Sequence, residues 1–135
     1  MAETDTVTVS ERLGGTYTND VKTTRHHLYT DEPAALGGSD LGPTPFEYLA
    51  AALGGCTTIT LRMYANRKDW PVEHLSVDVT THKEEGRNVF TRALTITGDL
   101  DETQKSRMLE IADKCPVHKA LAHEADIRTA LTTSS

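Results

Sequence analysis

The sequence has little cysteine, few aromatic residues and no long apolar run. Its 135 residues include two cysteines, and only 5% of the chain is aromatic. Two cysteines are too few for a disulfide-stapled scaffold, which small secreted domains use in place of a large core. No apolar stretch approaches the ~20 residues of a membrane-spanning helix, and the first residues have neither the basic nor the apolar region of a secretory signal. These absences predict a cytoplasmic protein with no membrane partner.

Positive charge is also in short supply. The formal net charge is −6, with 14 Lys and Arg against 20 Asp and Glu. A protein that grips nucleic acid needs a basic surface to neutralise phosphates, so this balance argues against a nucleic-acid partner. The composition, 37% hydrophobic and 25% charged, is that of an ordinary globular chain, and the length suits one core. We therefore expect a single domain over residues 1–135.

The sequence does contain a clear succession of short and long elements. Period-two alternation and turn residues predict strands at 6–10, 16–21, 25–29, 75–81, 89–97 and 126–131. Residues 84–88 are predicted to form a hairpin turn between the two long strands. Helix start and stop signals predict helices from 44 to about 66, from 101 to about 114 and from 115 to about 121. The second of these helices begins with a capping box between Asp101 and Gln104. The resulting order, β-β-β-α-β-β-α-α-β, predicts an α+β fold with a mainly antiparallel sheet.

The first predicted helix has the strongest start signal. Thr44 at N-cap, Pro45 at N1 and Glu47 at N3 form a capping box with a proline in the favoured place. Apolar and small residues at steps of four and three predict the buried stripe, namely Leu49, Leu53, Cys56, Thr60 and Met63. Cys56 is therefore expected to face inward, directly after an Ala/Gly stretch at residues 50–55 that allows another helix to approach closely.

The two cysteines, Cys56 and Cys115, are the candidate chemical groups. Cys115 precedes Pro116 at the start of a predicted short helix, where backbone N–H groups and the helix dipole stabilise a thiolate. Cys56 lies mid-helix on an apolar face, where loss of solvation disfavours a thiolate. The sequence alone therefore predicts that Cys115 has the more acidic sulfur. Taken singly, each thiol is also compatible with a small buried hydrophobe that only packs.

Motifs for other chemistries are missing. The sequence has no Ser-His-Asp order, phosphate loop or nucleotide-binding fingerprint. Cys115, His118 and His123 are spaced closely enough to share a metal, but three ligands across one short helix match metal geometry poorly. We therefore expect no metal site.

Two segments resemble the OsmC/Ohr superfamily. Residues 42–57, GPTPFEYLAAALGGCT, resemble the helix that carries its first cysteine, and residues 115–121, CPVHKAL, resemble its second-cysteine segment. Both occur in the family's order with the hairpin between them, so the resemblance covers nearly the whole chain. It implies an OsmC-like fold with a long central helix, in an intertwined homodimer whose active sites lie between subunits. The branch that it implies is a less characterised one, not the typical organic hydroperoxide resistance enzymes.

The resemblance also implies a function, that of a thiol-dependent peroxidase in oxidative-stress defence. The Cys56 thiolate would attack the O–O bond of a hydroperoxide and become a sulfenic acid. Cys115 would then close a disulfide, which an external dithiol would reduce again, and no cofactor is needed. The apolar helix face around Cys56 favours organic hydroperoxides over hydrogen peroxide.

The family's other functional residues carry over less completely. Its peroxidases place a carboxylate ten residues before the first cysteine, where Phe46 stands here and Glu47 follows one residue late. Glu47 is a candidate catalytic residue beside its capping role, although nine residues at ~100° each rotate it ~180° from Cys56. The carboxylate orients an arginine that activates the thiolate. The arginines considered for that role are Arg12, Arg25, Arg62 and Arg67.

These departures support an alternative function of another class. The same interface pocket would bind a small apolar or thiol-bearing molecule without turnover, with the cysteines as contacts. The missing carboxylate favours this alternative, and the retained pair of cysteines favours the peroxidase.

Overall fold

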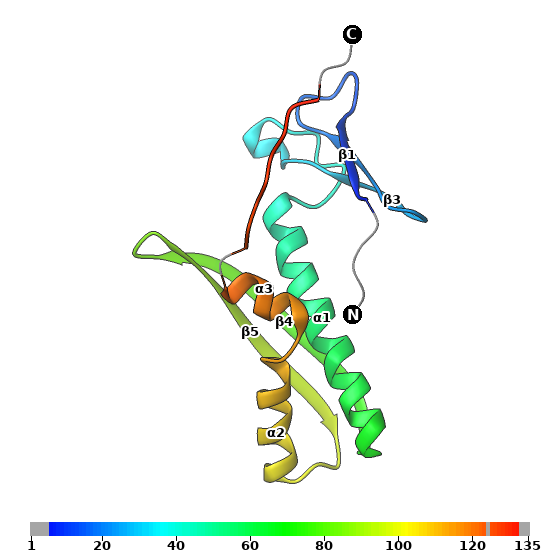
Figure 1. The fold of residues 1–135 in the computed structure, drawn as a ribbon, viewed down its shortest axis with the longest axis vertical. Coiled ribbons are helices and arrows are strands. Elements are labelled where there is room, and N and C mark those ends of the chain that lie inside the picture. The colour runs from blue at the N-terminus through cyan, green and yellow to red at the C-terminus, as the bar shows by residue number, and fades with distance from the viewer. Residues whose placement is uncertain (1–5, 124, 133–135) are drawn as a thin grey trace. The chain divides into compact units, whose positions relative to one another are not determined.

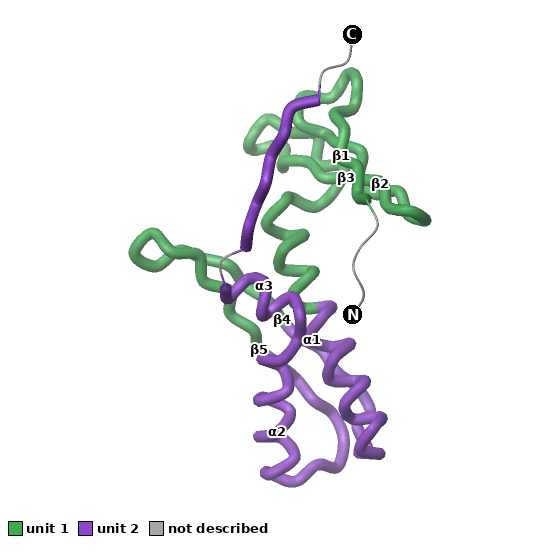
Figure 2. Tube along the Cα trace, viewed as in Figure 1, with its two compact units in different colours: residues 1–54, 78–93 green, residues 55–77, 94–135 purple. Residues whose placement is uncertain are grey.

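The computed structural model describes residues 6–123 and 125–132, and the chain divides into two compact units (Figures 1 and 2). Unit 1 comprises Met1–Gly54 and Asp78–Ala93, and unit 2 comprises Gly55–Val77 and Leu94–Ser135. No helix in the described part of the chain is both long enough and apolar enough to cross a membrane.

The elements follow the predicted order up to the last helix. They are β1 (Thr8–Glu11), β2 (Asn19–Lys22), β3 (His27–Thr30), the 3-10 helix η1 (Ala34–Leu36), α1 (Pro45–Lys68), β4 (Val72–Glu84), β5 (Arg87–Gly98), α2 (Glu102–Ala112) and α3 (Pro116–Ala122). Strands β1, β2 and β3 form one antiparallel sheet with β2 in the middle, and β4 pairs with β5. This mixture of helices and antiparallel strands confirms the predicted α+β fold.

The predicted closing strand at 126–131 is wrong. Described residues 125–132 have no regular secondary structure. Their alternation leaves Ile127 and Leu131 at 86% and 89% exposure, and Asp126 pairs with Arg128 within the segment. Alternating residues form a strand only where a neighbouring strand accepts the backbone hydrogen bonds, so the pattern alone was not sufficient.

A buried carboxylate, Asp31, organises unit 1. It accepts hydrogen bonds from the Thr18 hydroxyl at 2.7 Å and from the backbone N–H of Glu32 at 2.8 Å. The N–H groups of Leu41 and Ser39, at 3.2 and 3.4 Å, complete the set. One side chain thus ties β3 to the loop that leads into α1. These donors, the Thr18 hydroxyl first, hold the pKa of Asp31 below its ordinary value of 3.8, against the opposing effect of burial.

The start of α1 is fixed as predicted. The Thr44 N–H donates to Glu47 Oε1 at 2.8 Å, and the Glu47 N–H donates to Thr44 Oγ1 at 3.2 Å, which confirms the capping box. The Tyr48 hydroxyl donates to the Tyr29 carbonyl at 2.6 Å. Gly42 is required nearby, because a Cβ there would lie 2.3 Å from the same carbonyl oxygen.

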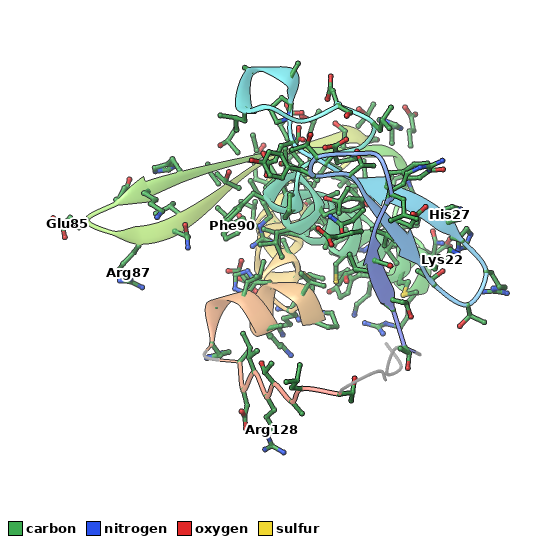
Figure 3. The ribbon with its side chains drawn as sticks, turned by 90° about the horizontal axis from the view of Figure 1, so that it is seen from above. Lys22, His27, Glu85, Arg87, Phe90 and Arg128 are labelled. Carbon is green, nitrogen blue, oxygen red and sulfur yellow. The ribbon has the colours of Figure 1, made fainter. Side chains whose placement is uncertain are left out.

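The β4–β5 hairpin closes in a two-residue turn. Glu85 and Gly86 both have positive φ, 50° and 79°, as a type I′ turn requires. Glu85 and Arg87 extend from the tip of the hairpin (Figure 3). The predicted turn is confirmed, with strands that run closer to it than alternation alone indicated.

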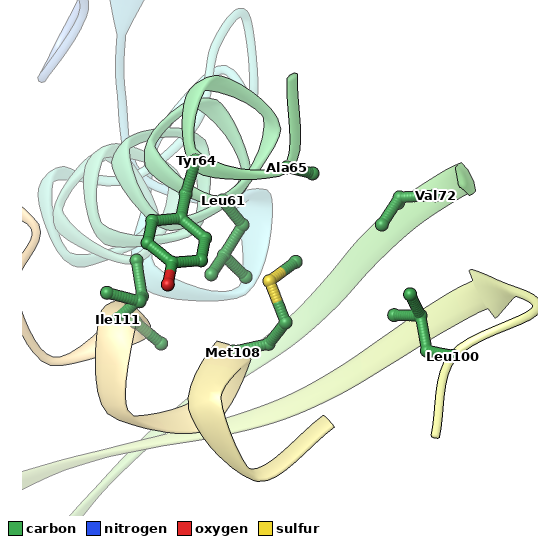
Figure 4. Packing of buried hydrophobic residues seen from close by; sticks show 8 residues of the cluster. Leu61, Tyr64, Ala65, Val72, Leu100, Met108 and Ile111 are labelled. Carbon is green, nitrogen blue, oxygen red and sulfur yellow. The ribbon is translucent and has the colours of Figure 1, made fainter. Parts of the chain in front are cut away.

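Unit 2 has an apolar core. Its buried side chains come from α1, from the hairpin and the turn after it, and from α2 (Figure 4). They are Leu61, Tyr64, Ala65, Val72, Leu100, Met108, Ile111 and Ala112. The N-terminus of α2 is held by the predicted capping box between Asp101 and Gln104, which is present in both directions. The packing of α2 on α1 positions the segment that follows α2, which contains the second cysteine.

The buried stripe of α1 differs in part from the prediction. Leu53 and Cys56 are buried, as expected, but Leu49 and Met63 are 39% and 65% exposed. Within unit 2 the buried face runs instead through Leu61 and its neighbours in the core. Steps of three and four permit more than one stripe on a helix, and the position of α2 decides which one is covered.

Candidate functional site

Cys115 lies at the junction of α2 and α3. It is the N-cap residue of α3, with Pro116 at the first helical position, as the sequence predicted. Its sulfur accepts a hydrogen bond from the backbone N–H of His118 at 3.2 Å. The residue is fully buried, with no exposed surface. The sulfur thus takes the place that a Ser or Asp oxygen usually takes at a helix N-terminus.

Cys56 and Thr57 reach the same sulfur from α1. Cys56 is 5% exposed, and its side chain is near enough to Cys115 to raise the pKa of the Cys115 thiol. Thr57 is fully buried, and its Oγ1 lies 4.0 Å from Cys115 Sγ. Both cysteines are free thiols. The structure therefore brings the two predicted cysteines together within unit 2, and it adds a threonine that the sequence analysis did not single out.

The helix N-terminus does not make the Cys115 thiol acidic, contrary to what its N-cap position indicated. Burial raises the pKa of the Cys115 thiol above its ordinary value of 9.0, and the neighbouring Cys56 side chain raises it further. The His118 N–H and the Thr57 hydroxyl act in the opposite direction and do not compensate. The sequence showed the helix N-terminus, but it did not show how completely the sulfur is removed from water.

Two of the candidate arginines share unit 2 with the thiols and bond elsewhere. Arg62 Nη1 donates to the backbone carbonyl of Val72 at 2.8 Å. The Arg67 guanidinium lies over the ring of Tyr64, 5.5 Å from its centroid. Both side chains therefore act at the apolar core of the unit.

The other two arginines belong to unit 1. Arg12 pairs with Asp20 at 3.7 Å and lies over the Tyr29 ring at 5.1 Å. Arg25 lies in the turn between β2 and β3, where its N–H donates to Thr23 Oγ1.

The structure accounts for Glu47 and Phe46 at the start of α1. The Glu47 carboxylate accepts from the Thr44 N–H in the capping box. Phe46, at the family's carboxylate position, is 47% exposed. Glu47 therefore has a structural role, and a catalytic role for it remains a prediction.

Among residues 6–123 and 125–132, no three His, Cys, Asp or Glu side chains form a cluster able to hold a metal ion. The His118 ring is directed to Asp113, with Nδ1 3.9 Å from the carboxylate.

Thr57 could have been found from the sequence. It is a polar residue beside Cys56 and one helical turn before Leu61, on the face of α1 that is buried. A buried hydroxyl needs a hydrogen-bond partner, so a threonine on this face marks a polar contact in the interior. What the sequence does not show is that the contact is the sulfur of Cys115.

The chain thus combines an α+β fold with two buried thiols, one on a long helix and the other at the N-cap of a short helix. The family model for OsmC-like proteins matches residues 37–130, which include both cysteines. The chain therefore belongs to the OsmC-like protein family, which confirms the resemblance.

Solved structures of the family share this fold. The OsmC-like protein of Mycoplasma pneumoniae superposes with a TM-score of 0.76 at 18% identity, over 90% of this chain and 88% of that one. An organic hydroperoxide resistance protein OsmC of Legionella pneumophila gives 0.61 at 25% identity, over 86% and 88%. The organic hydroperoxide resistance protein OhrB of Bacillus subtilis gives 0.58 at 22% identity, over 86% and 90%. No curated protein matches the sequence.

Proposed function

We propose that this protein is a thiol-dependent peroxidase that reduces organic hydroperoxides through Cys56 and Cys115. The observation that carries the proposal is that two buried thiols from elements far apart in the sequence lie near enough for Cys56 to raise the pKa of Cys115. A sulfenic acid formed on one sulfur would have the second thiol beside it, in a site from which water is largely excluded. The names of the similar proteins from Legionella pneumophila and Bacillus subtilis support the same substrate class.

Cys56 takes the first step in this proposal. Its thiolate attacks one peroxide oxygen, so that an S–O bond forms and the O–O bond breaks, and the alkoxide that leaves takes up the proton that the thiol had released. Cys115 is the less suitable attacker, because it has no exposed surface and because burial raises the pKa of its thiol. It stays protonated until the sulfenic acid appears, and it then closes the disulfide with loss of water.

An external dithiol resets the pair by thiol–disulfide exchange. The reductant, a cytoplasmic location and a role in oxidative-stress defence are parts of the proposal. The cycle as written needs no metal and no organic cofactor. It also does not require Glu47, whose carboxylate is engaged in the helix cap.

We also propose that the chain acts as a homodimer. Ile59 and Met63, four residues apart on α1, are 50% and 65% exposed. A second copy would remove this apolar pair from water. Sedimentation equilibrium tests the assembly: a dimer is expected for the wild type, and Met63→Asp should weaken it. A wild type that sediments as a monomer at micromolar concentration contradicts the dimer and leaves the thiol chemistry open to its own test.

Intact mass spectrometry tests the peroxidase. Reduced protein treated with one equivalent of cumene hydroperoxide should lose two hydrogens within seconds, as the disulfide forms. The Cys115→Ser variant should instead hold a sulfenic acid on Cys56 that dimedone traps, and the Cys56→Ser variant should react no faster than free cysteine.

The opposite result would favour the alternative function. If the wild-type thiols stay reduced under these conditions, the pair is a packing or ligand contact, and the protein is a binding module of the family.

A further inference from the structure

The buried hydroxyl of Thr57 lies near the sulfur of Cys115, the second cysteine of the pair. Thr57 and Cys115 are both fully buried, and Thr57 Oγ1 lies 4.0 Å from Cys115 Sγ. The two residues are 58 positions apart in the sequence, so the contact exists only because α1 packs at the α2–α3 junction. Hydroxyls inside a protein are costly to bury without a hydrogen-bonding partner, and the sulfur is one.

Two hydrogen-bonding groups from different elements thus converge on the Cys115 sulfur. The His118 N–H is a fixed donor at 3.2 Å, because an amide can only donate. The hydroxyl of Thr57 is adaptable, since either atom of the Thr57–Cys115 pair can donate while Cys115 is a thiol. Once Cys115 loses its proton, Thr57 is the one member of this pair that can still donate a hydrogen bond. The contact therefore becomes stronger as the thiolate forms, in an interior where such bonds count for more than in water.

We propose that Thr57 is a positioning residue for the second cysteine, one whose hydroxyl donates to the Cys115 sulfur as the thiolate develops and so speeds closure of the disulfide with Cys56. This role rests on the proposed peroxidase function. It concerns the second chemical step and leaves the attack on the hydroperoxide unchanged.

The step balances without any further reagent. Cys115 gives up its thiol proton, and its sulfur attacks the sulfur of the Cys56 sulfenic acid. The S–S bond forms, the S–O bond breaks, and the hydroxide that leaves combines with the released proton as water. Thr57 keeps its own proton throughout and contributes a hydrogen bond only. The lowering effect of its hydroxyl on the pKa of Cys115 is in keeping with this role.

The test compares Thr57→Val with Thr57→Ser. Valine keeps the shape of threonine and removes the hydroxyl, whereas serine keeps the hydroxyl. After one equivalent of cumene hydroperoxide, stopped-flow and dimedone trapping measure how long the Cys56 sulfenic acid persists. We expect closure to be about tenfold slower in Thr57→Val, the lower end of what one hydrogen bond to a charged group contributes. Thr57→Ser should close within about twofold of the wild type.

A pH profile separates this role from a purely structural one. In Thr57→Val the closure rate should reach its half-maximum at a higher pH than in the wild type, and serine should restore the wild-type profile. A lower thermal stability without this shift would be a packing effect and would overturn the proposal. If the valine variant does not fold, Thr57→Ala provides the same two readouts and the same decision.

The failures of the two proposals are distinguishable. If Cys115→Ser never forms a sulfenic acid, the peroxidase is wrong and the role of Thr57 falls with it. If the wild type closes its disulfide and Thr57→Val closes it equally fast with the same pH profile, the peroxidase stands and the role of Thr57 is overturned.

Discussion

Asp31 in unit 1 and Cys115 in unit 2 are both buried ionisable groups, and folding shifts their pKa values in opposite directions. Asp31 accepts from a threonine hydroxyl and from backbone N–H groups, whereas Cys115 accepts from one backbone N–H and has a threonine hydroxyl nearby. At Asp31 the Thr18 hydroxyl is 2.7 Å away and three N–H groups join it, so that the pKa is lowered. At Cys115 the Thr57 hydroxyl is 4.0 Å away and one N–H joins it, so that burial prevails and the pKa is raised.

Ionisation of a buried group therefore depends on how many hydrogen-bond donors surround it and on how close they are. A helix N-terminus alone does not make an acidic thiol, even with the sulfur in the capping position. A carboxylate with a full set of donors stays charged with little contact with water. The arrangement at Cys115 suits a thiol that stays protonated until Cys56 is oxidised. The arrangement at Asp31 suits a carboxylate that stabilises the fold.

The largest loss of thermal stability should come from Asp31→Asn. The amide has the same size, but its NH2 group faces N–H donors and its neutral oxygen accepts more weakly. We expect the greatest loss of thermal stability among these variants. Asp20→Asn, on a surface pair with His27, is the matched control and should change stability little. Equal melting temperatures for the two variants would contradict the anchoring role.

The lowered pKa of Asp31 predicts how the stability of the fold changes at acid pH. Because the pKa of Asp31 in the folded state lies below its ordinary value of 3.8, the folded state favours the ionised form. This stabilisation is complete above that value and is lost as pH falls through the folded pKa. Urea unfolding from pH 6 to pH 2 should therefore show a steeper decline for the wild type than for Asp31→Asn.

A smaller effect is expected from Thr18→Val, which removes the closest donor to Asp31. Stability should fall by about 1–3 kcal/mol, the cost of leaving a buried partner short of a hydrogen bond. The acid decline should also start at a higher pH, because the Thr18 hydroxyl is the main cause of the lowered pKa of Asp31. Thr18→Ser retains the donor and serves as the control, and a valine variant as stable as the serine variant would refute the argument.

Cys115 should make the stability of the fold decrease as pH rises through the alkaline range. Its folded pKa lies above the ordinary value of 9.0, so the folded state holds the thiol proton more tightly than the unfolded chain does. The resulting stabilisation is present below that value and is lost as pH rises. Urea unfolding between pH 7 and pH 10 should show a smaller alkaline loss in Cys115→Ala than in the reduced wild type. Parallel curves would show that burial of the thiol does not couple to folding.

The smallest effect is expected from Glu47→Gln. Glutamine serves at the N3 position of a capping box, so stability should change by no more than about 0.5 kcal/mol. The rate of sulfenic acid formation on Cys56 should stay at the wild-type value, measured with the same hydroperoxide. A large loss of rate with unchanged stability would make Glu47 a catalytic residue after all.

Local features of the fold could be predicted from the sequence. The capping boxes at Thr44 and Asp101, the N-cap position of Cys115 and the turn at Glu85 each depend on residues within a few positions of one another. These features agree with the prediction because the contacts that stabilise them lie within one short segment of the sequence.

Features that depend on distant partners could not be predicted in the same way. Met63 fits a helical stripe as well as Leu61 does, and only the packing of α2 decides between them. Ile127 and Leu131 alternate like strand residues without a strand formed in residues 125–132. The contact of Thr57 with Cys115, and the resulting balance of burial against donors, likewise exists only in three dimensions.

The hydrogen bond from the His118 amide to the Cys115 sulfur has a practical consequence. An amide proton that points at sulfur senses the electron density there, and that density differs between a thiol, a thiolate and a disulfide. The His118 cross-peak in a nitrogen–proton correlation spectrum is therefore a built-in reporter of the chemical state of Cys115. It needs no label on either cysteine, and it would follow titration and turnover at the one thiol that solvent-borne probes reach least.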